Sequence, residues 1–338
     1  MKKIYFLSTS NIPENWSETF NDIVKVDPDE VIIVSNTEVY IDGNWGSLFK
    51  ILNPWLEQTN KFAHIVTPHL PTQFLASRII TEQSYAMVES VIPLYKDKHY
   101  DQLVWDRVYC SYMFRPSESR GRLLDTLVAN DLLKDGYVTY HNTSVETHPG
   151  FAYHNKSPIL FNEESYSKDV LSHFTDPHLY RNSFIDVVAE ASYQPYHCFL
   201  TEKTIRAVCH EKPFITVGSP SFHKKYLRDL FGFKLYDEII DYSFDSKICL
   251  QERINGVVEN LKNIISNKDK LDSYYETLLP KLKHNKKRLL DIYNDPNKII
   301  PKCLQQLLDP NFEYIKYGHN PSILHLTEKY RNQNGKLS

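Results

Sequence analysis

The 338-residue sequence is poor in glycine, with ten in all, and it contains no G-x-G-x-x-G and no G-x-x-x-x-G-K stretch. The dinucleotide-binding fingerprint and the P-loop are therefore absent, because both use glycines to bring the backbone close to phosphate. The G-x-S-x-G turn of α/β-hydrolases and the H-E-x-x-H spacing of zinc proteases are also missing. Four large classes of catalytic motif are thereby excluded.

Cysteine is scarce and shows no metal-binding or disulfide pattern. The chain has five cysteines, an odd number, and none of them forms a C-x-x-C pair. This usage favours free thiols in a reducing compartment. The fourteen histidines are scattered, so we predict no structural metal. The only Asp-x-Asp triplet, Asp27-Pro28-Asp29, precedes a predicted strand, which is the wrong end for a metal-diphosphate site.

No strong charge excess and no long apolar run is present. The net charge is −3, which does not indicate a nucleic-acid-binding protein, and 41% of the residues are hydrophobic, as in globular proteins. The apolar run near the N-terminus is too short for a signal peptide or a membrane span. We therefore expect a cytoplasmic protein without a membrane span.

Three short apolar runs in the first hundred residues predict buried strands. They cover residues 4–7, 31–34 and 62–66. Each run is continuous rather than alternating, which is typical of parallel strands buried on both faces. Apolar spacing between residues 71 and 94 predicts a helix. Residues 1–100 are expected to form a small α/β domain.

A second alternation of strands and helices follows, which favours a doubly wound α/β domain over residues 101–270. The predicted strands and helix are, in order, 103–105, 108–114, the helix 123–133, and the strands 137–140 and 184–192. Residues 271–338 are expected to form a helical extension and tail. Helix breaks are predicted near Asn267 and at Pro280.

The stretch from Cys198 to Ala207 predicts a loop that enters a helix. Thr201 suits the N-cap position, and Glu202 suits the positive end of the helix dipole. Lys203 and Arg206 are three residues apart and lie on neighbouring parts of one helix face. A helix N-terminus flanked by cations can bind a phosphate or a diphosphate.

Glu190, Glu202 and Lys203 are candidate ligand-binding residues because they lie near predicted strand ends or helix starts. A nucleotide sugar needs a cation for its diphosphate and a carboxylate for its ribose, and a Lys–Glu pair supplies both. The alternative is that Glu202 and Lys203 are ordinary surface residues of a first helical turn. The local sequence weighs these two interpretations equally.

Arg120 belongs to a basic loop, residues 115–122, that leads into a predicted helix. Arginine is suited to bidentate phosphate contacts. A solvated loop with surface arginines is the commoner outcome, and it remains the alternative here.

Three blocks of sequence occur in the order of a known family. They are Ala189-Glu190-Ala191-Ser192, Phe199–Thr204 and Pro213–Gly218. They resemble the F-E-N-S, Y-I/V-T-E-K-L and V-P-I/V-x-x-G blocks of the donor-binding half of α1,3/4-fucosyltransferases. This chain departs from the family in two places: its first block reads Ala-Glu-Ala-Ser, and its third block contains Phe214. Upstream, the segment from Arg120 to Leu127 is similar to the family's R-x-x-x-x-D-x-L helix start.

The resemblance covers roughly residues 105–245 and implies a GT-B fold, with two Rossmann-like doubly wound domains facing a cleft. It implies that the N-terminal domain is on the acceptor side and that the C-terminal domain binds the nucleotide sugar. Arg120 and Lys203 would neutralise the diphosphate, Glu202 would hold the ribose, and Glu190 would line the sugar end. Arg206, three residues after Lys203, is a further candidate donor-binding residue by its position.

The function implied by the resemblance is that of a metal-independent, inverting glycosyltransferase, a hexosyl- or pentosyltransferase without a cofactor. Its donor would be a nucleotide-diphosphate sugar, with a GDP-linked sugar as one option, and its acceptor a glycan or another hydroxyl compound. The family takes its base from the N-terminal domain. Glu38 and Asp42, after the second predicted strand, are candidates for that base by position only.

Two other functions remain open from the sequence. One is a sugar transferase that acts on modified bases in DNA, which would need a basic face on the N-terminal domain. The other is a catalytically inactive GT-B-like binding module.

Overall fold

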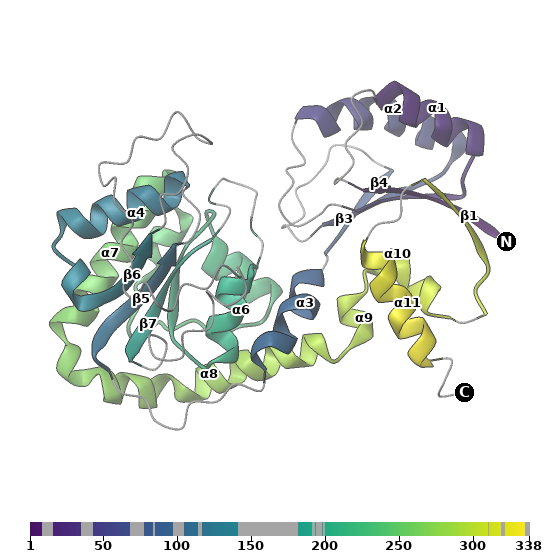
Figure 1. The fold of residues 1–338 in the computed structure, drawn as a ribbon. Helices are drawn as coiled ribbons and strands as arrows, with labels where there is room; N and C mark the ends of the chain where they lie inside the picture. The colour runs from purple at the N-terminus through teal and green to yellow at the C-terminus, as the bar shows by residue number, and fades with distance from the viewer. Residues whose placement is uncertain are drawn as a thin grey trace. The chain divides into compact units, whose positions relative to one another are not determined.

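The computed structural model describes residues 1–8, 16–34, 43–67, 78–83, 85–96, 105–113, 117–140, 182–190, 193, 198, 200–309, 311–318 and 322–334. The chain is an α/β protein with two parallel sheets, each in its own compact unit (Figure 1). The first unit comprises Met1–Ser90 and Ile292–Ser338, and the second comprises Val91–Asp291. The predicted extension, residues 271–338, is thus divided: residues 271–291 group with the second unit, and residues 292–338 group with the N-terminal residues.

The sheet of the first unit has five parallel strands in the order β4-β3-β2-β1-β9. The three predicted apolar runs form its centre, as expected for strands buried on both faces. The fifth strand comes from near the C-terminus and pairs with the first. The strands are β1 (Lys2–Ser8), β2 (Glu30–Val34), β3 (Ala63–Thr67), β4 (Ile79–Gln83) and β9 (Tyr314–Gly318).

Helices cover both faces of this sheet (Figure 1). On one face, α1 (Trp16–Val26) and α2 (Gly43–Thr59) pack on alternate strand residues such as Tyr5, Val31 and Ile65. The other face receives the C-terminal segment, because Gln306 bonds to both Lys2 and Glu30. The elements of that segment are α9 (Pro296–Ile299), α10 (Lys302–Gln305), η8 (Gln306–Leu308) and α11 (Ser322–Asn334).

Two helix predictions are wrong. The predicted helix over residues 71–94 is replaced by β4 and by the shorter α3 (Ala86–Tyr95), because residues 79–83 pair in parallel with β3. The predicted break at Pro280 does not occur, since α8 (Leu271–Tyr293) runs through it. Buried leucines on both sides of Pro280 hold α8 together at the cost of one backbone hydrogen bond. The predicted break near Asn267 is confirmed.

The sheet of the second unit has four parallel strands in the order β6-β5-β7-β8. The strands predicted at 108–114, 137–140 and 184–192 are confirmed within a few residues, whereas Leu103 and Val104 lie outside the described residues. The strands are β5 (Arg107–Met113), β6 (Gly136–Tyr140), β7 (Ser183–Ala189) and β8 (Phe214–Val217).

Helices α4 (Glu118–Ala129) and α7 (Leu250–Ser266) pack together on one face of this sheet, and α6 (Glu202–Cys209) contacts β7 and β8 from the other (Figure 1). The chain leaves β5 through α4 toward β6, and leaves β7 through α6 toward β8. Because β5 and β7 are neighbours, these two crossovers run in opposite directions. Open α/β sheets bind ligands at such a switch point, outside the carboxyl ends of the strands.

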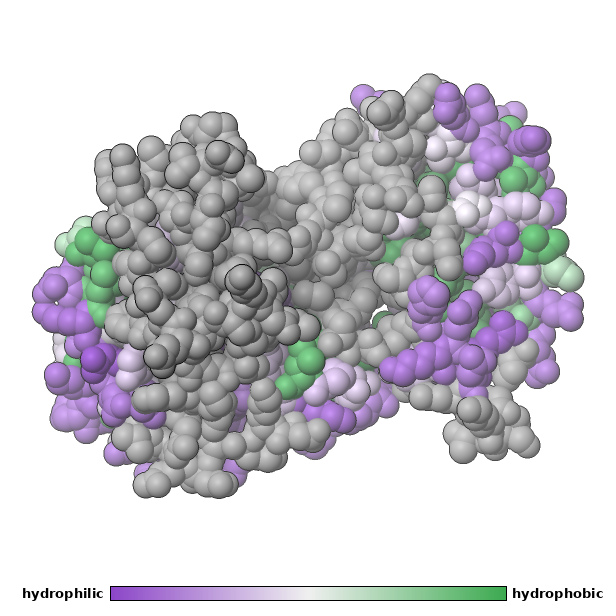
Figure 2. All heavy atoms as spheres, in the orientation of Figure 1, coloured by the Kyte–Doolittle hydropathy of each residue, from purple (hydrophilic) through white to green (hydrophobic). Residues whose placement is uncertain are grey.

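The exposed surface of the described residues carries few large apolar side chains. They include Phe62, Val128 and Ile248, and Figure 2 shows hydrophobic residues as separate areas among hydrophilic ones. Scattered apolar residues of this kind are normal on a protein surface. Among the described residues, no helix has both the length and the apolar character needed to cross a membrane.

Candidate functional site

The candidate site lies at the carboxyl edge of the second sheet, around the switch point between β5 and β7. Glu190 follows β7 directly, and α6 begins twelve residues later at Glu202. The first turn of α4, which contains Arg120, follows β5. The hydroxyl of Tyr193 donates to Glu118 Oε2 over 2.7 Å and so ties the segment after β7 to the start of α4.

Thr201 is the N-cap of α6, as predicted. Its backbone is extended, with φ −101° and ψ 175°, and its side-chain oxygen accepts a hydrogen bond from the Lys203 amide at 3.3 Å. The preceding residue, Leu200, is buried, and its amide donates to the Tyr226 hydroxyl at 3.0 Å. The buried approach and the cap together fix the position at which α6 begins.

Glu190 is buried beneath the first turn of α6. Its Oε1 accepts the Thr204 hydroxyl at 2.6 Å, and its Oε2 accepts the Thr201 hydroxyl. Burial raises the pKa of this carboxyl, and the charge of Lys203 and the two threonine hydroxyls offset only part of that rise. Both carboxyl oxygens are thus used within the protein, so Glu190 positions the turn that carries Glu202 and Lys203.

Glu202 and Lys203 form an ion pair in the first turn of α6. The Lys203 Nζ atom lies 2.5 Å from Glu202 Oε1. Burial raises the pKa of Glu202, but the adjacent Lys203 charge and hydrogen bonds outweigh it and hold the pKa below its usual value. Lys203 is only 8% exposed, which is unusual for a lysine. The pair is therefore not an ordinary pair of surface residues.

Arg120 lies in the first turn of α4 and is buried, with 6% of its surface exposed. Its amide donates to the hydroxyl of the N-cap residue Ser117 at 3.4 Å. Arg122 is exposed and pairs with Glu118 at 2.8 Å, as expected for a surface arginine. Arg115 lies outside the described residues. Arg120 is therefore a buried cation at the carboxyl edge of the second sheet, unlike the exposed Arg122.

Arg206, which the sequence places near the donor, belongs to the core of the second unit. Its guanidinium pairs with Asp186 of β7 at 3.1 Å, and both side chains are 1% exposed. It also lies over the ring of Tyr112, 4.8 Å from the ring centre. We therefore assign Arg206 to the packing of α6 against the sheet.

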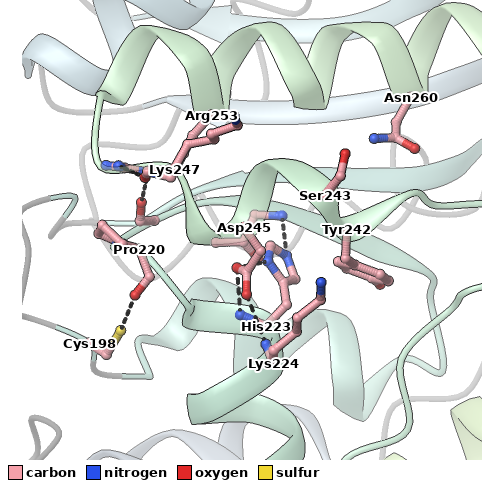
Figure 3. A network of polar contacts seen from close by, with 12 residues as sticks. Cys198, Pro220, His223, Lys224, Tyr242, Ser243, Asp245, Lys247, Arg253 and Asn260 are labelled. Atoms are coloured by element: carbon pink, nitrogen blue, oxygen red, sulfur yellow. Dashed lines mark hydrogen bonds and ion pairs between the residues drawn. The ribbon is translucent and has the colours of Figure 1, made fainter.

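Two buried residues that the sequence reasoning missed hold the loops behind this edge (Figure 3). Asp245 accepts hydrogen bonds from the amides of His223 and Lys224 at the start of the π-helical segment η5 (Phe222–Leu230), and it also bonds to the His223 ring. Arg253 of α7 donates to Gly218 O after β8 and to Tyr193 O after β7. No short motif reveals these residues, because their partners are distant in sequence.

The N-terminal predictions have different outcomes. Glu38 and Asp42, the candidates for the base, lie outside the described residues. The Asp27–Asp29 triplet lies before β2, at its amino end, as expected. There Asp29 accepts the Lys3 amide at 2.7 Å, and Asp27 pairs with Lys61 at 2.5 Å.

Comparison with known proteins gives no relative. No family model matches the chain, and the searches of curated proteins and of solved structures found no match either.

Proposed function

We propose that the chain is a metal-independent, inverting glycosyltransferase of GT-B architecture that uses a nucleotide-diphosphate sugar. The observation that supports this most strongly is the placement of two buried cations, Arg120 and Lys203, in the first turns of the two helices that flank the switch point. Side chains that the protein already holds in place at this edge would bring positive charge to a bound diphosphate. Lys203 would do so beside Glu202, with which it forms an ion pair.

The transfer reaction would require little more from the second unit than stabilisation of the leaving group. An acceptor hydroxyl oxygen forms a bond to the anomeric carbon, the bond to the diphosphate oxygen breaks, and the hydroxyl proton passes to a base. The negative charge then grows on the leaving diphosphate, where preorganised cations contribute most to the rate. Lys203 and Arg120 would bind this charge, and the positive end of the α6 helix dipole would favour it.

Glu202 would bind the ribose hydroxyls of the donor. Its pKa is lowered, so the carboxylate is ionised near neutral pH and can accept two hydroxyl hydrogen bonds. Glu190 would act indirectly, as a positioning residue. Its hydrogen bonds with Thr201 and Thr204 hold the turn that carries Glu202 and Lys203. The base is expected in the N-terminal unit, where Glu38 and Asp42 remain predictions.

The experiment that tests this function is a screen of nucleotide sugars for thermal stabilisation, followed by a transfer assay with the sugars that bind. Binding to the native state raises the melting temperature with ligand concentration. We expect stabilisation by one class among GDP-, UDP-, CMP- and dTDP-linked sugars, and transfer to a hydroxyl acceptor without added metal. No stabilisation by any of them would contradict the proposal.

The same assay separates the two other hypotheses. Transfer to duplex DNA with modified bases, together with salt-sensitive binding of the duplex, would indicate the DNA-modifying function. Donor binding without hydrolysis or transfer to any acceptor would indicate the inactive binding module.

A further inference from the structure

We propose that the first unit contains a metal site for Zn²⁺ or a similar divalent ion, formed by His64, Glu82 and Cys303. The three residues lie in separate elements, β3, β4 and α10. Their imidazole, carboxylate and thiol ligand atoms all lie within 4.8 Å of one another. This set of nitrogen, oxygen and sulfur ligands is the one that Zn²⁺ prefers in proteins.

The register of the sheet places the first two ligands together. His64 of β3 pairs with Ile80 of β4, and Glu82 follows Ile80 by two residues. Because side chains alternate along a strand, Glu82 and His64 project from the same face. The Nδ1 atom of His64 lies 2.9 Å from Glu82 Oε1.

The C-terminal segment brings the third ligand to this face. The amide of Cys303 donates to Glu82 Oε2 at 2.8 Å, which fixes the start of α10 over β4. This contact leaves Glu82 Oε1 on the His64 side. Cys303 is buried, whereas the side chains of His64 and Glu82 retain 16% and 13% exposure, so an ion has a route to the ligands.

A second layer of polar contacts orients the imidazole. The Nε2 atom of His64 lies 3.1 Å from Glu30 Oε1, on the side of the ring away from Glu82. Glu30 is held in turn by Lys2 at 2.6 Å and by Gln306 at 2.9 Å. A carboxylate that accepts the far N–H of a histidine directs the lone pair of the other ring nitrogen toward a metal. Glu30 and His64 have this arrangement, with Nδ1 facing Glu82.

The distances require a small adjustment on binding. In a tetrahedral zinc site with ligand bonds of about 2.0–2.3 Å, neighbouring ligand atoms are separated by roughly 3.6 Å. Ligand atoms up to 4.8 Å apart would therefore close by about 1 Å at most. The Nδ1–Oε1 pair, now 2.9 Å apart, would open slightly, and side-chain rotation can provide both changes. His64 would bind through the lone pair of Nδ1, Glu82 through Oε1 and Cys303 as the thiolate, and the thiol proton, with any proton held at Nδ1, would pass to water.

The site would join distant parts of the chain. Its ligands come from strands in the first hundred residues and from the segment that returns near the C-terminus, so one ion would fasten that segment to the sheet. Three protein ligands leave a fourth position for water or another ligand. The inference does not depend on the proposed transferase function, because no residue of the site belongs to the second unit.

The test uses Co²⁺ as a spectroscopic probe on the full chain after chelator treatment. We expect one equivalent of Co²⁺ to bind with a thiolate-to-cobalt charge-transfer band in the near ultraviolet. The band should vanish in Cys303→Ser and persist in Cys249→Ser, whose cysteine is exposed and lies in the second unit. Zn²⁺ should displace Co²⁺ and raise the melting temperature of the wild type and of Cys249→Ser, but not of Cys303→Ser.

A second variant keeps the proposal testable if Cys303→Ser unfolds. Glu82→Gln retains the shape and an oxygen that can accept the Cys303 amide, yet it removes the charged ligand, so its affinity for Co²⁺ should fall by about tenfold or more. No band in the wild type, an equal band in Cys303→Ser, or unchanged affinity in Glu82→Gln would overturn the proposal. The cluster would then be a hydrogen-bonded contact that docks α10 on the sheet.

Discussion

The hydroxyl of Thr204 donates a hydrogen bond to Glu190 Oε1 over 2.6 Å, and both residues are buried. This contact joins the residue that directly follows β7 to the first turn of α6. It determines where Glu202 and Lys203 stand relative to the carboxyl edge of the sheet. The geometry of the proposed donor site therefore depends on a pair of residues that need not touch the donor.

Removing the Thr204 hydroxyl should weaken this anchor. Thr204→Val keeps the shape of the side chain but leaves Oε1 of the buried Glu190 carboxyl with only the long contact to the Thr201 amide, at 3.5 Å. We expect the free energy of unfolding, measured in urea, to fall by about 1–3 kcal/mol. Thr277→Val is the matched control, because the Thr277 hydroxyl bonds to Ser273 O on an exposed helix face and its loss should change little. Equal effects in both variants would contradict this role of Thr204.

Glu190 and Glu202 should give opposite pH dependences of stability. The folded pKa of Glu190 is raised, so its contribution to stability is fully present below the unfolded pKa, about 4.3, and is lost as the pH rises through the folded value. The folded pKa of Glu202 is lowered, so its contribution is present above about 4.3 and is lost as the pH falls through the folded value.

The measurement is urea unfolding at a series of pH values that extends from well below the unfolded pKa of about 4.3 up to neutral. Relative to the wild type, Glu190→Gln should gain stability as the pH rises, and Glu202→Gln should gain stability as the pH falls. The two difference curves should therefore slope in opposite directions. Curves with the same slope would show that one of the two assigned shifts has the wrong sign.

The buried pair of Asp186 and Arg206 should be essential for folding. Asp186→Ala leaves a buried guanidinium without its carboxylate, so we expect the free energy of unfolding to fall by about 3–5 kcal/mol. Asp229→Ala removes the partner of Arg228 on the exposed surface and should have a much smaller effect. Comparable losses of unfolding free energy in the two variants would contradict a core role for Arg206. Arg206 would then again be a candidate donor-binding residue.

The C-terminal strand should depend on glycine at position 318. Gly318 has φ +72°, and a Cβ there would lie 2.3 Å from the backbone oxygen of Phe6 in β1. Gly318→Ala should therefore disturb the pairing of β9 with β1 and destabilise the first unit.

The control for this variant is Gly232→Ala. Gly232 also has a positive φ, +75°, but its added Cβ would meet only the side chain of Arg288, at 3.1 Å. The positive φ alone costs about 1–2 kcal/mol in either variant. In thermal or urea unfolding, Gly318→Ala should lower the free energy of unfolding by more than this value. A loss no greater than that of Gly232→Ala would contradict the close approach to Phe6.

Local pattern was sufficient to predict most of the buried strands and the start of α6. Continuous apolar runs indicate β1, β2 and β3, and the Thr201 cap places the start of α6 at Glu202. β9 was not predicted, because most of its side chains are exposed or half-buried and its place is set by pairing with β1. β4 was mistaken for part of a helix because its apolar residues also fit helical spacing.

Candidate site residues were predictable where a short segment carries the signal, as at Thr201–Lys203, and the contacts that join distant segments were not. Thr201, Glu202 and Lys203 form one motif, whereas the burial of Arg206 against Asp186 depends on which face of α6 meets the sheet. The cluster around His64 could not be predicted, since its residues meet only through strand register and the return of the C-terminal segment.

The central claim is that a nucleoside diphosphate binds at the start of α6 through Lys203. The most direct test is calorimetric titration with GDP first, and then with the diphosphates of the other bases, into the wild type, Lys203→Ala and Lys225→Ala. Lys225 is exposed and lies in η5, so it serves as the matched cation control. Glu202→Gln, titrated with GDP and with pyrophosphate, reports on the ribose contact.

We expect one nucleoside diphosphate to bind the wild type and Lys225→Ala equally, and to bind Lys203→Ala about tenfold or more weakly, a loss of ~1.4 kcal/mol or more. Glu202→Gln should lose affinity for that nucleotide but not for pyrophosphate. If Lys203→Ala binds the nucleotide as tightly as the wild type does, or transfers sugar at the normal rate, the assignment of the donor site to Lys203 is wrong.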